Sequence, residues 1–66
     1  MWTVIYIAQN NNVAKRYQDL LVQEGVLVQL RLVGSAHATA NTSVEILVPE
    51  SEAEEAHEII TGYMGE

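Results

Sequence analysis

The alternation of apolar and polar residues in the first half of the chain predicts a strand followed by a helix. Residues 2–8 are rich in β-branched and aromatic side chains and stop at a cluster of asparagines, which is typical of a strand. Apolar residues, Tyr17 among them, then recur at helical spacing over about residues 12–24 and should face the core. Asn11 or Asn12 should start this helix, because asparagine caps helix N-termini, and Gly25 should end it by adopting the left-handed conformation after the last turn.

The second half of the chain predicts two more strands and a second helix. Residues 26–33 and 43–48 both alternate between apolar and polar positions, and Pro49 ends the second of these runs. Ser51 and Glu54 then have the spacing of a capping box, so we expect a helix that starts at Ser51. Its inward-facing residues should be Ala53, Ala56, Ile60 and Tyr63.

The order β-α-β-β-α predicts an α+β fold formed by a single domain over residues 1–66. A right-handed crossover makes the first two strands parallel, and the second and third strands form an antiparallel pair. The compact arrangement is a three-stranded sheet of order 1-3-2 with both helices on one face. This is a ferredoxin-like unit that lacks its fourth strand.

Two surfaces stay uncovered in this predicted fold. One is the free edge of the first strand, which is apolar and shows no charge, proline or bulge that would protect it from pairing with another chain. The other is the bare face of the sheet. If Ile5 and Ile7 point toward the helices, the bare face carries the alternate residues Trp2, Val4, Tyr6, Gln29, Arg31, Glu45 and Leu47.

These surfaces predict self-association, with a dimer favoured. Aromatic residues beside an arginine are enriched at the centres of protein interfaces, and Arg31 is expected to pair with Glu45 across neighbouring strands. Contact through the sheet face and contact through the strand edge remain equal alternatives, and Trp2 and Tyr6 could instead cap the core of a monomer. The expected interface residues are Trp2, Val4, Tyr6, Arg31 and Leu47.

Length and charge sharpen this expectation. A chain of 66 residues buries little surface, and without cysteine it has no disulfide or thiolate metal site to support it, so a second copy is the expected support. The formal net charge of −6 excludes a nucleic-acid binder that works by neutralising phosphates. The apolar run at the start is too short to span a membrane and has no basic flank, so we expect a cytoplasmic protein.

The start of the first helix is a candidate anion site. Lys15 and Arg16 are two of only three basic residues and lie where cations oppose the helix dipole. Together with Asn11, Asn12 and the free backbone N–H groups of the first turn, they could bind a small anionic metabolite or a nucleotide phosphate. The simpler interpretation, which we favour, is that both cations lie on the solvated side of the helix.

The two histidines carry weaker signals. His37 is the one titratable residue of the connection over residues 34–42, which is long enough to be a ligand- or partner-binding loop. Glu54 and His57 have the spacing of half a metal site, with Glu58 adjacent, but a solvated acidic helix face explains them better. No phosphate-binding loop, nucleophile elbow or metalloprotease motif occurs in the sequence, so we expect no enzyme, no metal and no cofactor.

The order and spacing of several segments resemble the small prokaryotic signal-transducing protein family, a domain of unknown function. The segments that carry the resemblance are Glu24-Gly25-Val26, residues 44–50, Ala53, Ala56 and Ile59-Ile60, with Ala14 and Leu20-Leu21 in the first helix. The resemblance covers nearly the whole chain. It implies similarity to the ferredoxin-like nitrogen-regulatory P-II proteins, in which the connection between strands two and three contacts partners.

The resemblance implies a bacterial, oligomeric sensor or adaptor rather than an enzyme. This chain lacks the fourth strand and has a much shorter connection than the P-II proteins, so it inherits no ligand-binding residue from them. The expected function is therefore a non-enzymatic regulatory or partner-binding module that acts as a homo-oligomer. The alternative is the anion binder at the start of the first helix.

Overall fold

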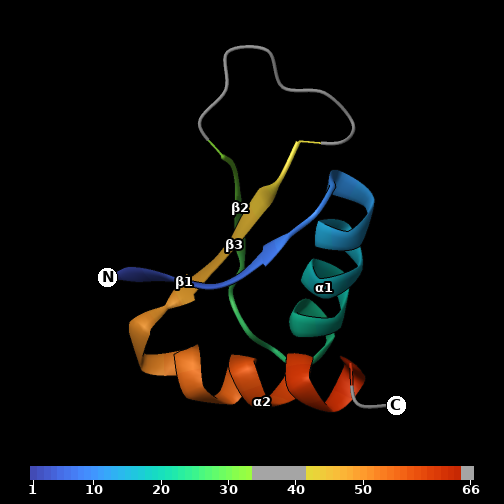
Figure 1. Ribbon diagram of the computed structural model, residues 1–66. Helices are drawn as coiled ribbons and strands as arrows, with labels where there is room; N and C mark the ends of the chain where they lie inside the picture. The colour runs from blue at the N-terminus through green and yellow to red at the C-terminus, as the bar shows by residue number, and fades with distance from the viewer. Residues whose placement is uncertain (34–41, 65–66) are drawn as a thin grey trace.

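The computed structural model describes residues 1–33 and 42–64 of the chain. The elements are β1 (Trp2–Ala8), α1 (Asn11–Gln23), β2 (Gln29–Leu32), β3 (Val44–Pro49), a 3-10 turn η1 (Glu50–Glu52) and α2 (Ala53–Met64). Their order is β-α-β-β-α, as the sequence predicts, and the fold is α+β (Figure 1). The connection that carries His37 lies outside the described residues.

The sheet has the predicted strand order β1-β3-β2, with β3 in the centre. Both outer strands run antiparallel to β3, so β1 and β2 point the same way. The helix α1 lies beside the sheet and α2 crosses below it (Figure 1). The placement of both helices on one face of the sheet stays a prediction.

The helix α1 begins one residue earlier than the sequence predicts. Asn10 is the N-cap residue: its backbone is extended and its side-chain Oδ1 accepts a hydrogen bond from the N–H of Val13 at 2.9 Å. This bond satisfies one of the N–H groups that a helix leaves free at its start. Asn11 and Asn12 are therefore the first helical residues, and both side chains are exposed.

The end of α1 is a Schellman motif centred on Gly25. The N–H of Gly25 donates to the carbonyl of Val22 and the N–H of Val26 donates to the carbonyl of Leu21, each at 3.0 Å. Gly25 has a φ of +83°, which a residue with a Cβ adopts only at a steric cost. The predicted stop at this glycine is confirmed.

A Gly25→Ala substitution should therefore lower the free energy of unfolding by about 1 kcal/mol. The matched control is Gly62→Ala in α2, where an added Cβ meets no atom within 4 Å and φ is ordinary. There alanine should stabilise the helix by up to about 1 kcal/mol. Urea denaturation of both variants should show a lower free energy of unfolding for Gly25→Ala and a higher one for Gly62→Ala. Equal changes in the two variants would contradict the explanation that the positive φ of Gly25 requires glycine.

The start of α2 differs from the prediction. Ser51 lies inside the 3-10 turn that follows Pro49, so it is not the N-cap of a capping box and that prediction is wrong. Proline fixes its own φ and favours an extended entry, and the turn then tightens before the α-helix begins at Ala53. The glutamates of this turn and of the first turn of α2 still suit the helix dipole.

The core lies against one face of the central strand. Val44, Ile46 and Val48 alternate along β3 and are almost completely buried. They belong to one cluster with residues from both helices, namely Ala14, Tyr17, Leu21, Ala56 and Ile60, and with Ala8 and Val26. The opposite face of β3 therefore presents Glu45 and Leu47.

A β-bulge in β1 changes which residues face the core. Val4 lies opposite Leu47 and Tyr6 lies opposite Ile46, so Ile5 is an extra residue between two consecutive partners. Beyond this residue the alternation is inverted: Tyr6 packs against the core, whereas Ile7 lies opposite Glu45 and is 54% exposed. The predicted orientations of Tyr6 and Ile7 are therefore wrong.

Candidate functional site

The first candidate site is the face of the sheet opposite the core side of β3, which we call the open face. Strand register and alternation place on it Trp2, Val4, Ile7, Gln29, Arg31, Glu45 and Leu47. Trp2 and Val4 are 45% and 38% exposed, so part of each large apolar side chain stays in contact with water. Tyr6, an expected member, does not lie on this face.

Leu47 forms the centre of the open face. It lies between Val4 on β1 and Gln29 on β2, and it is only 5% exposed although it does not belong to the main core cluster. Trp2, Val4 and Ile7 thus form an apolar strip along β1, and Leu47 lies beside Val4 on the central strand.

Arg31 and Glu45 form the polar side of the open face. The Arg31 Nε lies 2.6 Å from the Glu45 Oε1, and the two residues are direct cross-strand partners. The predicted pair is confirmed. Because Arg31 is largely exposed, the pair stabilises the fold only slightly, roughly 0.2–1 kcal/mol. Its larger effect is electrostatic, because it leaves the open face with no net charge in a chain whose formal charge is −6.

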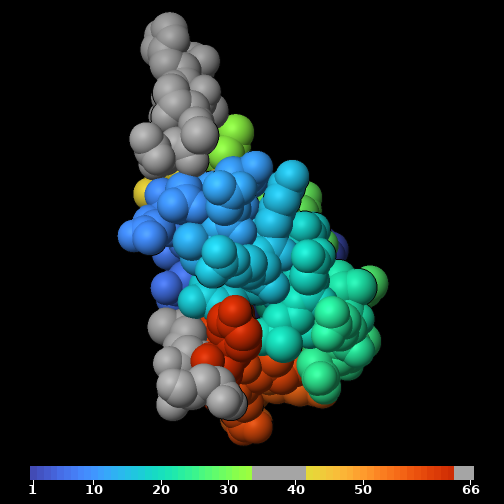
Figure 2. All heavy atoms as spheres, turned by 90° about the vertical axis from the view of Figure 1, so that its right-hand side faces the viewer, coloured from blue at the N-terminus to red at the C-terminus, as the bar shows by residue number. Residues whose placement is uncertain are grey.

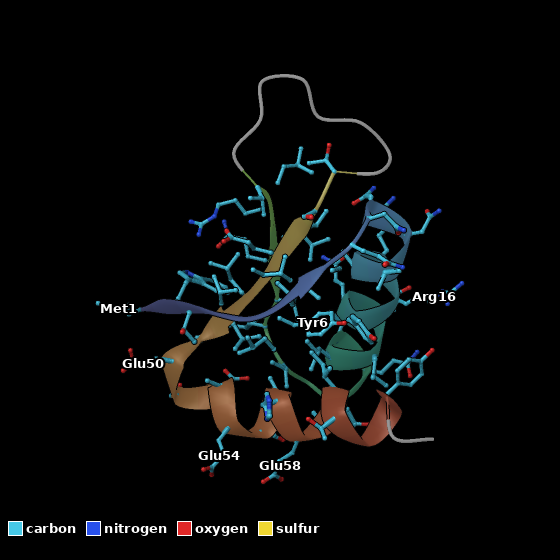
Figure 3. The ribbon with its side chains drawn as sticks, in the orientation of Figure 1. Met1, Tyr6, Arg16, Glu50, Glu54 and Glu58 are labelled. Atoms are coloured by element: carbon cyan, nitrogen blue, oxygen red, sulfur yellow. The ribbon has the colours of Figure 1, made fainter. Side chains whose placement is uncertain are left out.

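The second candidate site is a cluster of three tyrosines on the other side of β1. The Tyr17 ring lies 5.0 Å from the Tyr6 ring and 5.8 Å from the Tyr63 ring, centroid to centroid, and is nearly perpendicular to both. Figure 3 shows Tyr6 reaching from β1 toward α1. Figure 2 shows the red C-terminal part of α2 against the cyan surface of α1, where Tyr63 meets Tyr17.

A pocket of about 450 Å³ opens beside this cluster. The residues that line it come from β1 and its end, from α1 and from α2: Tyr6, Ile7, Gln9, Val13, Arg16, Tyr17 and Tyr63. Its volume falls within the range of small-molecule sites, about 300–1,000 Å³. The pocket thus combines three aromatic rings with one guanidinium and one amide.

Tyr17 is the most deeply placed hydroxyl-bearing residue of the pocket, with 8% of its surface exposed. Burial raises the pKa of Tyr17, and interaction with the Tyr6 and Tyr63 side chains raises it further, whereas the positive charge of Arg16 acts in the opposite direction. Tyr17 therefore remains a neutral hydroxyl at physiological pH.

The raised pKa of Tyr17 predicts a loss of stability at alkaline pH. The folded chain holds the Tyr17 proton more tightly than the unfolded chain, where the pKa is about 10.0, so this contribution is complete below pH 10 and disappears as the pH rises through the folded value. Denaturation at several pH values above and below 10 should show a smaller alkaline loss for Tyr17→Phe than for the wild type. Equal alkaline losses of stability in the two proteins would contradict the attribution of this effect to Tyr17.

The residues of the sequence-predicted anion site do not all meet. Asn11, Asn12 and Lys15 are exposed on α1, and the N–H of Val13 is already bonded to Asn10. Arg16 is also exposed, but it lines the tyrosine pocket, and Figure 3 shows it extending from α1 toward solvent. Neither cation has an ion pair within the part of the chain that the structure describes.

The acidic second helix offers no metal centre in the described ranges. His57 is exposed, and Glu54 and Glu58 point away from the sheet (Figure 3). Nowhere in residues 1–33 and 42–64 do three or more histidine, aspartate or glutamate residues gather closely enough to hold a metal ion. No helix in these ranges has the length and apolar character needed to cross a membrane.

Sequence reasoning missed the tyrosine pocket. Tyr17 and Tyr63 were both expected on inward-facing helix positions, but Tyr6 was expected on the opposite face of the sheet. The bulge at Ile5 brings Tyr6 to the other two rings. The one available signal was the presence of all three tyrosines in segments predicted to pack together.

Comparison of the chain with protein-family models, with curated proteins and with solved structures finds no match. The likeness to the small prokaryotic signal-transducing family stays a prediction from the sequence. The open face and the tyrosine pocket are therefore the features from which a function has to be inferred.

Proposed function

We propose that this chain is a cytoplasmic, non-enzymatic regulatory or partner-binding module that acts as a homodimer, formed by face-to-face contact of two sheets. The observation that carries the proposal is the open face itself. An apolar strip formed by Trp2, Val4 and Ile7 lies around the buried Leu47. Exposed apolar strips of this kind, bordered by polar residues, mark protein interaction sites.

Charge supports a second copy of the chain as the occupant. The open face carries one cation and one anion, Arg31 and Glu45, whereas five glutamates lie on η1 and α2. Two copies can therefore approach through their open faces without meeting the like charges that the rest of the chain carries. A two-fold contact uses the same patch of both copies, so a face without net charge would meet an equally neutral face.

The bulge in β1 favours the face over the edge. A bulge interrupts the regular row of N–H and C=O groups that an edge strand offers to a second chain, and natural proteins use bulges to block such pairing. This protection is not visible in the sequence of the strand. Of the two modes of self-association that the sequence left open, the bulge disfavours continuation of the sheet through β1.

Size supports self-association as well. The fully buried large side chains of the described residues are few, namely Leu21, Ile46, Val44 and Val48. Sheets that pack face to face lie about 10 Å apart and interdigitate their inner side chains. Packing of a second open face would add Trp2, Val4 and Ile7 to the buried apolar surface, which a 66-residue chain otherwise leaves in water.

The mass in solution tests the proposal. Sedimentation equilibrium over a concentration series should give the mass of a dimer at micromolar concentration and dissociation on dilution. Hydrogen exchange of the β1 backbone amides then identifies the surface, because face contact leaves the outward-pointing amides of the edge unprotected and edge pairing protects them. A monomer throughout the series, or protection of the edge, would contradict the proposed dimer.

A further inference from the structure

The tyrosine pocket has the chemistry of a binding site for an aromatic anion, and this inference does not depend on the proposed dimer. Tyr6, Tyr17 and Tyr63 meet edge to face rather than in parallel stacks, so ring surfaces remain available to a third aromatic group. Tyr63 is 46% exposed and lines the pocket.

The charge at the pocket comes from Arg16. The chain has three basic residues, and Arg31 is already bound to Glu45. Arg16 has no ion pair among the described residues and lines the pocket, whereas its neighbour Lys15 does not line it. A free guanidinium beside aromatic rings can bind a carboxylate through two parallel hydrogen bonds.

Pocket size and donor number narrow the ligand class. A volume of about 450 Å³ suits a single ring or a fused bicycle better than a dinucleotide. A phosphate dianion would need more donors than one guanidinium, and the N–H of Val13, which also lines the pocket, is already bonded to Asn10. A monocarboxylate is satisfied by Arg16, with the amide of Gln9 as a further polar neighbour.

We propose that the pocket binds a small planar aromatic carboxylate, with its ring among Tyr6, Tyr17 and Tyr63 and its carboxylate on Arg16. The proposed site shares Arg16 with the anion site expected at the start of α1. Its other contacts come from the three tyrosines and not from Asn11 and Asn12. Tyr17 lines the same pocket, and its hydroxyl carries no negative charge at neutral pH that would repel an anion.

Titration of the whole chain with three matched probes, followed by backbone amide NMR shifts, tests this site. Phenylacetate has both the ring and the carboxylate, cyclohexylacetate lacks the aromatic ring, and 2-phenylethanol lacks the charge. Phenylacetate should give saturable shifts centred on Gln9, Val13, Tyr17 and Tyr63 at millimolar concentration. The other two probes and inorganic phosphate should bind at least about tenfold more weakly, because each lacks one of the two interactions.

Two pairs of variants distinguish a specific binding site from general electrostatic attraction of anions to the chain. Arg16→Gln should weaken phenylacetate binding by about tenfold or more, and the adjacent Lys15→Gln, which removes the same charge from the same helix, should change it less than about twofold. Tyr63→Leu should weaken binding while Arg16 remains in place. Trp2→Glu, on the open face, should leave phenylacetate binding unchanged, so that failure of the dimer and failure of this site are distinguishable.

Three results would overturn the assignment. The first is the absence of saturable shifts with phenylacetate at millimolar concentration. The second is equal loss of binding in the Arg16 and Lys15 variants, which would show attraction by charge alone. The third is binding of cyclohexylacetate as tight as that of phenylacetate, which would show that the tyrosine rings do not take part.

Discussion

A Trp2→Glu variant will be monomeric at concentrations at which the wild-type chain is dimeric, if the open face is the contact surface. Trp2 lies at one end of the apolar strip and is 45% exposed in the single chain, so glutamate at this position can stay hydrated in the monomer. In the dimer the new carboxylate would lose its water without gaining a partner. We expect the dissociation constant to rise by at least about a hundredfold.

The matched control for Trp2→Glu is Val22→Glu. Val22 is an exposed apolar residue on α1, at 57% against 45% for Trp2. It lies off the open face, and the substitution adds the same negative charge. Sedimentation equilibrium of both variants, with circular dichroism to confirm the fold, separates a local interface effect from general repulsion. A dimeric Trp2→Glu chain, or dissociation of both variants, would contradict the face-to-face contact.

Most of the architecture could be predicted because each element carries a local signal. The strand of residues 2–8, the helix that stops at Gly25 and the strand that follows residue 42 all appear close to their expected positions. The φ of +83° at Gly25 is the clearest case, because few residues other than glycine can hold it. The strand order β1-β3-β2 could be predicted from the order and length of the segments that connect the strands, and no single residue determines it.

The orientation of β1 beyond residue 4 could not be predicted. The sequence of β1 alternates no differently at Ile5 than elsewhere, because a bulge is set by the register of the partner strand and by the packing of the residues that follow it. One inserted residue exchanged the places of Tyr6 and Ile7. It thereby removed a tyrosine from the open face and created the tyrosine pocket on the other side.

The bulge also links the two candidate sites. It protects the free edge of β1, which favours the open face as the contact surface, and it turns Tyr6 toward Tyr17. Because Tyr6 and Ile7 are adjacent, the aromatic wall of the pocket and the last apolar residue of the open face belong to the same short segment. Changes in the register of β1 should therefore affect both surfaces together.

Replacement of Leu21 by alanine will have the largest effect on stability. Leu21 is completely buried at the last turn of α1, and its carbonyl accepts the Schellman hydrogen bond from Val26. Truncation of a buried leucine to alanine removes apolar contacts and leaves a cavity, which costs about 3 kcal/mol. A 66-residue domain has a total stability of roughly 3–10 kcal/mol, so this single truncation should remove about a third or more of the free energy of unfolding.

The adjacent Val22→Ala is the control for Leu21→Ala, because Val22 is 57% exposed and its truncation should change stability by less than about 0.5 kcal/mol. Both variants should be compared by urea denaturation at one fixed chain concentration, since self-association adds concentration-dependent stability. The same comparison in the Trp2→Glu background separates the stability of the single chain from the stability added by self-association. The loss of unfolding free energy caused by Leu21→Ala should persist in this monomer. Similar losses for Leu21→Ala and Val22→Ala would contradict the placement of Leu21 in the core, and with it the way that α1 positions Tyr17 and Arg16 at the pocket.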